Sequence, residues 1–417
     1  MHRLALTALA TAATALAAAA AGPATAGAAA PPVTAADVEP HLKALADIAA
    51  ANGATRAAGT PGYTASADYV AGQLRAAGWT VRTQPVRFPF WRVRIPPVLG
   101  DLRPAEQFVV TRLSGKADGT GKLRALAKKD CRARTLRRGE IAVARSYGCD
   151  PLALARRVKA RGGLAVVYAV GRDRTLIPAT FERTSAVPVI EAKPSAIRAI
   201  LRRGGAIRVK VDAATVTARA DNVIADLPGT GKAIMAGGHL DSVLDGPGLN
   251  DNGSGVAALL EVAERLPSEP RKRPLRIAFW TAEEYGLLGS FAYADRLGER
   301  RLRREVGAYV NLDMVGSPNG KTEVYDTDDA LERRLRALLP GDEGETIVDG
   351  SSDHTAFAAA DVPVTGIYTG SSERGRGGKA RDACYHKACD GLANVDRETT
   401  AASATAVERL MAELAAG

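Results

Sequence analysis

The sequence predicts an α/β protein in which a mostly parallel central sheet is flanked by helices, with a small β-rich or α+β domain inserted into the chain. Two observations support this fold class. From residue 221 onward, short apolar strands alternate with helices, a pattern typical of parallel sheets that are covered on both faces. Residues 96–218 instead mix short β-like runs with short helical runs. The 417 residues are enough for more than one folded unit.

The N-terminus has the features of a secretory signal peptide. Arg3 precedes an Ala- and Leu-rich run, Gly22-Pro23 interrupts that run, and small residues follow. We expect 1–26 to be the signal peptide, with cleavage after Ala26 and a secreted, extracellular product. A membrane anchor is the alternative. The apolar run is short, and no later segment reaches the ~18 apolar residues needed to span a bilayer.

The expected elements follow from apolar periodicity and turn residues. In the N-terminal segment 27–95 we expect helices at 37–51 and 63–78 and a strand at 79–93. In the inserted segment 96–218 we expect several short strands and helical runs near 151–163 and 193–205. In the C-terminal segment 219–417 we expect strands 222–227, 233–238, 275–280, 307–312 and 362–368, and helices 255–266, 286–297, 331–339 and 399–416.

Charge is distributed unevenly along the chain. The total is 56 Lys+Arg against 46 Asp+Glu, a net charge of +10. Residues 101–210 hold 25 basic and 9 acidic residues, a net +16, so the remainder, with 31 against 37, is net −6. The basic insert is interpreted either as a lid or spacer or as a docking surface for cell wall or another anionic polymer. It has no recognition motif for specific nucleic-acid binding.

Four cysteines are consistent with export to an oxidising compartment. Proximity along the chain favours the disulfides Cys131–Cys149 and Cys384–Cys389, although four cysteines allow three pairings. A cysteine-based metal site is the less favoured alternative.

Metal-binding side chains follow three strands of the expected sheet. In open α/β sheets, ligands bind outside the carboxyl ends of the strands. Histidine and carboxylates without thiolates suit zinc in a catalytic site. Five protein ligands are too many for one open catalytic zinc, but they suit two ions that share a carboxylate. The five candidates are His239, Asp251, Glu284, Asp313 and His386.

The segments that contain these residues resemble a known family. The motifs HLDS, NDNGSG, AEEYGLLGS, NLDMVG, SDH and CYHKACD are similar to those of the secreted double-zinc aminopeptidases. That family includes bacterial leucyl aminopeptidase-like enzymes and relatives of plasma glutamate carboxypeptidase and glutaminyl cyclase. The resemblance covers residues 221–400 and implies a zinc exopeptidase-like fold that binds two Zn²⁺ per chain. The insert resembles a protease-associated domain.

The resemblance also implies roles for individual residues. One zinc takes His239 and Asp313, the other takes Glu284 and His386, and Asp251 bridges the two. Glu283 is the expected general base, Asp241 orients the His239 imidazole, and Tyr385 hydrogen-bonds the oxyanion. The resemblance further implies a cis peptide bond between Asp251 and Asn252.

The substrate pocket is less well defined by the sequence. Met314, Gly316 and Tyr368 are expected to line an apolar side-chain pocket. Ser351 stands where related enzymes often have an arginine that holds the substrate, so Arg374, Arg376 or Arg381 is the candidate replacement. Outside the ligand set, His354 is interpreted as a residue beside the site, with a metal-ligand role as the alternative, and His41 as a surface or packing residue.

The sequence therefore predicts a secreted, monomeric, zinc-dependent aminopeptidase that acts on peptides with apolar N-terminal residues. A carboxypeptidase or dipeptidase of the same fold remains open, because pocket charges set the direction of an exopeptidase. A glutaminyl cyclase-like acyltransferase is disfavoured by the complete set of five ligands, and so is a binding protein that has lost catalysis.

Overall fold

A computed structural model describes residues 30–127, 130–145, 148–169, 171–173, 176, 181, 183–326, 329–341, 344–346 and 350–417. The predicted signal peptide, 1–26, lies outside these residues. Within the described ranges, no helix has both the length and the apolar character needed to cross a bilayer.

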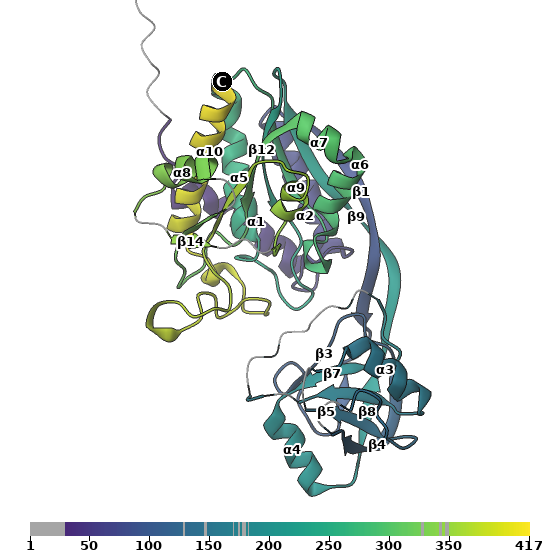
Figure 1. Ribbon diagram of the computed structural model, residues 1–417. Helices are drawn as coiled ribbons and strands as arrows, with labels where there is room; N and C mark the ends of the chain where they lie inside the picture. Colours follow the sequence, from purple (N-terminus) through teal and green to yellow (C-terminus); the bar gives the residue numbers. More distant parts are fainter. Residues whose placement is uncertain are drawn as a thin grey trace, which may run out of the picture. The chain divides into compact units, whose positions relative to one another are not determined.

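The larger of the two sheets has eight strands (Figure 1), in the order β1-β9-β11-β10-β12-β15-β13-β14. The four strands β11, β10, β12 and β15 run parallel to one another, which confirms the mostly parallel central sheet. The bounds are β1 (Thr80–Val93), β9 (Ala213–Leu227), β10 (Ala233–His239), β11 (Leu275–Trp280), β12 (Val306–Leu312), β13 (Glu323–Tyr325), β14 (Gly344–Thr346) and β15 (Val364–Tyr368).

Helices cover both faces of this sheet, because alternate residues of its buried strands point to opposite sides. Ile277 and Val310 belong to the core of one face, whereas Ala278 and Tyr309 belong to the core of the other. The first core is packed by α1 (Ala35–Ala51), α2 (Pro61–Ala76), α5 (Gly253–Arg265), α8 (Asp329–Leu338) and α10 (Arg397–Ala416). The second is packed by α6 (Leu288–Leu297), α7 (Glu299–Glu305) and α9 (His354–Ala358).

A second sheet of seven strands lies within the expected insert, in the order β2-β8-β4-β5-β6-β7-β3. Its strands are β2 (Val98–Leu99), β3 (Phe108–Val110), β4 (Ala117–Ala125), β5 (Ile141–Ala144), β6 (Ala165–Tyr168), β7 (Val189–Ala192) and β8 (Ala206–Val211). The helix α3 (Pro151–Ala160) packs on one face and α4 (Pro194–Arg203) on the other. The expected mixture of strands and short helices is therefore present. The domain boundaries at 95/96 and 218/219 stay a prediction.

The strand β9, which pairs with β1, is longer than the strand that the sequence predicted. The strand expected at 222–227 is only the last part of β9, which pairs with β1 from Thr80↔Asp226 to Val93↔Ala213. Trp91 and Ala213, near the end of this pair, belong to the core of the second sheet. The first part of β9 is largely exposed, so it lacked the apolar signal from which a strand is predicted.

Candidate metal centre

The order of the strands brings the predicted ligands to one edge of the sheet. β10 lies between β11 and β12, and all three are parallel, so their carboxyl ends meet. His239 is the last residue of β10, and Asp313 follows β12 directly. Glu284 lies in the 3₁₀ turn η2 (Glu283–Tyr285), four residues beyond the end of β11.

The fourth ligand, Asp251, lies just before α5, and its peptide bond to Asn252 is cis, as predicted. The Asn252 side chain fixes this turn. Its Oδ1 accepts hydrogen bonds from the backbone N–H groups of Gly255 and Met314, and its Nδ2 donates to the Leu312 carbonyl. The start of α5 is therefore tied to the loop that follows β12.

Two groups of ligand atoms share the Asp251 carboxylate. In the first group, His239 Nε2 lies 3.3 Å from Asp251 Oδ1 and 3.3 Å from Asp313 Oδ1. In the second, His386 Nε2 lies 3.0 Å from Asp251 Oδ2 and 3.2 Å from Glu284 Oε1. Each oxygen of one carboxylate thus faces a different imidazole, which is the arrangement that a bridging ligand between two metal ions requires.

The electrostatics of this cluster fit bound cations. Glu284 Oε1 is buried, and the His386 imidazole that faces it at 3.2 Å does not form a hydrogen bond of good geometry. Burial would lower the pKa of His386, but Glu284 and Asp251 outweigh it and raise that pKa to about 10. Burial likewise opposes protonation of His239, yet the surrounding carboxylates, Asp313 first, raise its pKa well above the usual value. The residues present therefore fit two divalent ions.

The His239 ring is held by the residue two positions further on. His239 Nδ1 lies 2.9 Å from the backbone carbonyl of Asp241, so Nδ1–H donates there and Nε2 faces the carboxylates. The Asp241 carboxylate, at 3.8 Å from Nδ1, accepts instead from the backbone N–H of Glu283. Burial raises the pKa of Asp241 to about 7.

Ser352 supports the ligand Asp313, and the sequence did not single it out. The Ser352 hydroxyl donates to Asp313 Oδ2 over 2.6 Å and accepts from the side chain of Asn311 over 2.9 Å. The neighbouring Ser351, which was expected to bind substrate, is exposed. The SDH motif begins at Ser352, so the family resemblance was the available signal for this serine.

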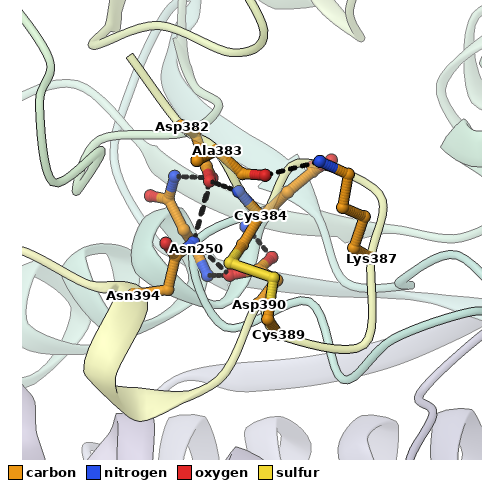
Figure 2. The surroundings of a disulfide bond; sticks show 9 residues. Asn250, Asp382, Ala383, Cys384, Lys387, Cys389, Asp390 and Asn394 are labelled. Carbon is orange, nitrogen blue, oxygen red and sulfur yellow. Dashed lines mark hydrogen bonds between the residues drawn. A yellow bond between two sulfur atoms is a disulfide. The ribbon is translucent and has the colours of Figure 1, made fainter. Parts of the chain in front are cut away.

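Both predicted disulfides are present, Cys131–Cys149 and Cys384–Cys389. The second closes the loop that carries Tyr385 and His386. Figure 2 shows its surroundings, in which two buried carboxylates join this loop to the turn before Asp251. Asp390 accepts the backbone N–H groups of Asn250 and Asp251, over 2.8 and 3.0 Å.

Asp382, which precedes Cys384 at the start of the loop, also binds the turn before Asp251. Its Oδ2 accepts from Asn250 Nδ2 over 2.7 Å, and its Oδ1 accepts from the Cys384 backbone N–H over 2.7 Å (Figure 2). Asn394 Nδ2 donates to both Asp382 and Asp390. This network positions Asp251, the candidate bridging ligand, together with the His386 loop. Asp390 directly follows Cys389 in the sequence. This position beside the disulfide is the sequence feature that could have indicated its role.

Arg56 is a second buried residue that supports the site, and no sequence motif pointed to it. Its side chain is fully buried, and it donates to the carbonyls of Leu240, Pro247 and Gly248. Burial lowers its pKa to about 10, although nearby carboxylates oppose this effect. Arg56 therefore holds the loop that leaves His239.

The predicted pocket residues differ in their burial and in their contacts. Met314 is buried, and Gly316 packs so closely that an added Cβ would lie 2.6 Å from Thr400 Oγ1. Tyr368 is partly buried and its hydroxyl donates to Glu373 Oε1.

Among the candidate arginine anchors, Arg381 forms a two-bond ion pair with Glu323 and Arg374 donates to the Gly378 carbonyl. The side chain of Arg376 lies outside the described part. His354 is buried and packs edge-on against Tyr325.

Comparisons with known proteins identify the class that this fold and site define. Residues 222–411 match the family model of peptidase family M28. A probable lipoprotein aminopeptidase of Mycobacterium tuberculosis is 35% identical over 401 residues, which cover 86% of this chain and 80% of the relative. An aminopeptidase of Pseudomonas aeruginosa is 31% identical over 419 residues, covering 87% and 78%.

Solved structures agree with the fold. An aminopeptidase from Aneurinibacillus sp. strain AM-1 matches with a TM-score of 0.73 at 26% identity, covering 92% of this chain and 94% of that one. A zinc aminopeptidase from Bacillus subtilis matches with a TM-score of 0.75 at 23% identity, covering 92% and 95%. The chain belongs to peptidase family M28. The predicted class, an aminopeptidase, is confirmed.

The disulfide network gives a testable consequence. Replacing both Cys384 and Cys389 by serine should weaken zinc binding about 10–100-fold, because the loop that presents His386 loses its closure. Competition with a chromogenic zinc chelator measures this affinity. The matched control is the C131S/C149S double variant, which removes the other disulfide from the second sheet and should leave zinc affinity unchanged. Equal affinity in the two double variants would contradict the positioning role.

Proposed function

We propose that this enzyme hydrolyses the N-terminal peptide bond at a dinuclear zinc site built on Asp251. His239 and Asp313 bind one ion, Glu284 and His386 bind the other, and Asp251 bridges them. The observation that carries this assignment is the single carboxylate placed between two imidazoles, 3.3 and 3.0 Å away. When bound, the two ions polarise the scissile carbonyl as Lewis acids and lower the pKa of the attacking water.

Glu283 is the proposed general base. It adjoins the ligand Glu284 in η2 at the carboxyl end of β11, and its backbone N–H is fixed by Asp241. Burial raises the pKa of Glu283 well above its ordinary value, and Asp313 and Glu284 add to this although His239 opposes it. A carboxylate with a raised pKa accepts a proton from water more readily and returns it to the leaving amine.

Tyr385 is the proposed donor to the oxyanion. Its ring stacks on that of the ligand His386, with centroids 3.8 Å apart. Burial, assisted by Asp251 and Glu284, raises the pKa of Tyr385 far above its usual range, so the phenol keeps its proton. A protonated phenol beside the ligands can hydrogen-bond the negative charge that develops on the carbonyl oxygen.

The carboxylates are proposed to select the N-terminal end of the peptide, and the neighbouring residues are proposed to select its N-terminal side chain. The free α-amine of the substrate is placed near Asp313 and Glu283, whose charges attract an ammonium group. Met314, Gly316, Tyr368 and Ser351 are proposed to surround an apolar N-terminal side chain such as leucine. Carboxypeptidase, dipeptidase and glutaminyl cyclase activities are the alternatives.

Replacing Glu283 by glutamine should lower kcat for Leu-p-nitroanilide about 10²–10⁴-fold, because the base is lost while the metal ligands remain. The zinc content of E283Q, measured by mass spectrometry, should stay at the wild-type value. E299Q, at an exposed glutamate of α7, is the matched control. A rate within threefold of wild type in E283Q would overturn the assigned role.

The same assay tests which end of the peptide the enzyme cleaves. Acetylation of the leucine α-amine should abolish hydrolysis if the free amine is recognised. Release of C-terminal amino acids from a peptide library would instead assign a carboxypeptidase.

We further propose secretion after cleavage behind Ala26 and a monomeric product. The two disulfides support an oxidising compartment. Intact-mass analysis of protein recovered from culture medium measures the cleavage site, and a product that retains residues 1–26 in the cells would contradict it. Light scattering reports the mass in solution, and a dimer mass would contradict the monomer.

The basic insert is proposed to dock on an anionic polymer such as cell wall. Exposed cations gather beside α3, where Arg161 donates to the backbone carbonyls of Arg132 and Arg134. Charge reversal at Arg137 and Arg138, also exposed in this loop, should reduce the salt concentration needed to elute the protein from phosphocellulose. Reversal at Arg300 and Arg304 on α7 makes the same change in net charge. Equal loss of retention in both variants would contradict a dedicated docking surface.

A further inference from the structure

A third group of potential metal ligands lies outside the peptidase centre. It consists of His41 on α1 and of Glu261 and Glu264 on α5, whose ligand atoms all lie within 4.8 Å of one another. Among the described residues, the other two groups of this kind are those that share Asp251. No proposed step of peptide hydrolysis uses His41, Glu261 or Glu264.

The helices explain how these side chains meet. Glu261 and Glu264 are three residues apart, so they lie on the same face of α5. The helix α1 packs against α5 (Figure 1), and His41 is on the buried side of α1. His41 and Glu261 are only 5% and 6% exposed, whereas the Glu264 side chain is 44% exposed. The group is therefore buried at one end and open to solvent at the other, which gives an ion a route of entry.

The spacing of the ligand atoms matches that of a zinc site. His41 Nε2 lies 3.3 Å from Glu261 Oε1 and 3.4 Å from Glu264 Oε1. Around a tetrahedral zinc with bonds of ~2.0–2.1 Å, neighbouring ligand atoms are ~3.3–3.4 Å apart. In the peptidase centre, His239 Nε2 lies 3.3 Å from each of its two carboxylates. The third group thus has the same histidine-to-carboxylate spacing as the first.

Two of the three ligands are held by further contacts. His41 Nδ1 lies 2.7 Å from the Tyr69 hydroxyl, so with Nδ1–H donating to that oxygen, Nε2 is left as the coordinating atom. Arg265 Nε lies 3.9 Å from Glu261 Oε2, the oxygen that does not face His41. Burial, and to a smaller extent Glu264 and Glu261, raise the pKa of Tyr69 to about 12.

The surrounding charges leave the group in need of a cation. Besides Glu261, the Arg265 guanidinium contacts Asp37 at 3.3 Å and Glu408 at 3.8 Å. The Arg265 guanidinium is thus shared by three carboxylates, and Glu264 is a further carboxylate of the group. Of these, Glu261 and Glu408 are buried. Buried carboxylates are costly unless they are paired or bind a metal, so a divalent ion at Glu261 would add to the pairing that Arg265 supplies.

We propose that His41, Glu261 and Glu264 bind a third zinc ion, with water completing the tetrahedron. This zinc joins α1 to α5. Because α5 begins at Gly253, directly after the Asp251-Asn252 turn, the ion fastens the helix that starts beside the bridging ligand. Its role is structural, and it is independent of the roles proposed for the peptidase centre.

Zinc stoichiometry of the whole protein tests this. After dialysis against buffered micromolar zinc, inductively coupled plasma mass spectrometry should find three zinc ions per chain. Glu264→Gln, at the half-exposed ligand, should reduce this to two, with hydrolysis of Leu-p-nitroanilide and its zinc dependence unchanged. His41→Gln should also give two. Asp47→Asn, which removes an exposed carboxylate from α1, should keep three.

Unfolding provides a second readout. Raising free zinc beyond the level that saturates activity should raise the Tm of the wild type and of D47N, but not that of E264Q. Equal zinc content in the wild type and in E264Q overturns the proposal, whatever number of ions the peptidase centre holds. Three zinc ions retained in both E264Q and H41Q overturn it as well, since the third ion would then lie elsewhere.

Discussion

The Asp251 carboxylate between two imidazoles is the interaction on which the rest of the site depends. Its two oxygens face His239 and His386, which come from segments almost 150 residues apart in the sequence. Oδ1 faces His239 at the end of β10, and Oδ2 faces His386 in the disulfide loop. Any shift of this carboxylate changes both groups of ligands at once, so the structure must fix it from several sides.

The surrounding structure meets this requirement with buried polar contacts. The Asp390 carboxylate accepts the backbone N–H of Asp251 itself, and Asn252 ties the same turn to the loop after β12. Arg56 holds the loop beyond His239. Buried polar groups of this kind are stabilising only when each has a partner, and a cation bound at Glu284 Oε1 would add a partner to the His386 imidazole 3.2 Å away. Metal binding and local order at this edge of the sheet are therefore coupled.

The sequence predicted the parts of the site that depend on strand ends and short-range chemistry. Apolar runs of six or seven residues located β10, β11 and β12, and so His239, Glu284 and Asp313 fell at one edge. The pairing of Cys384 with Cys389 followed from proximity, and the cis bond at Asp251 followed from family resemblance. β13 and β14, at three residues each, are too short to show a period, and the exposed half of β9 has no apolar signal. Ser352, Asp382 and Arg56 act through contacts with distant segments, which no local pattern encodes.

The central claim is that one carboxylate bridges two zinc ions. Anomalous diffraction at the zinc absorption edge, from crystals of the zinc-saturated protein, tests it most directly. The account predicts two anomalous peaks about 3.5–4 Å apart, one bound by Asp251 Oδ1 together with His239 and the other by Asp251 Oδ2 together with His386. A single peak at this position, or two peaks that Asp251 does not join, would contradict it.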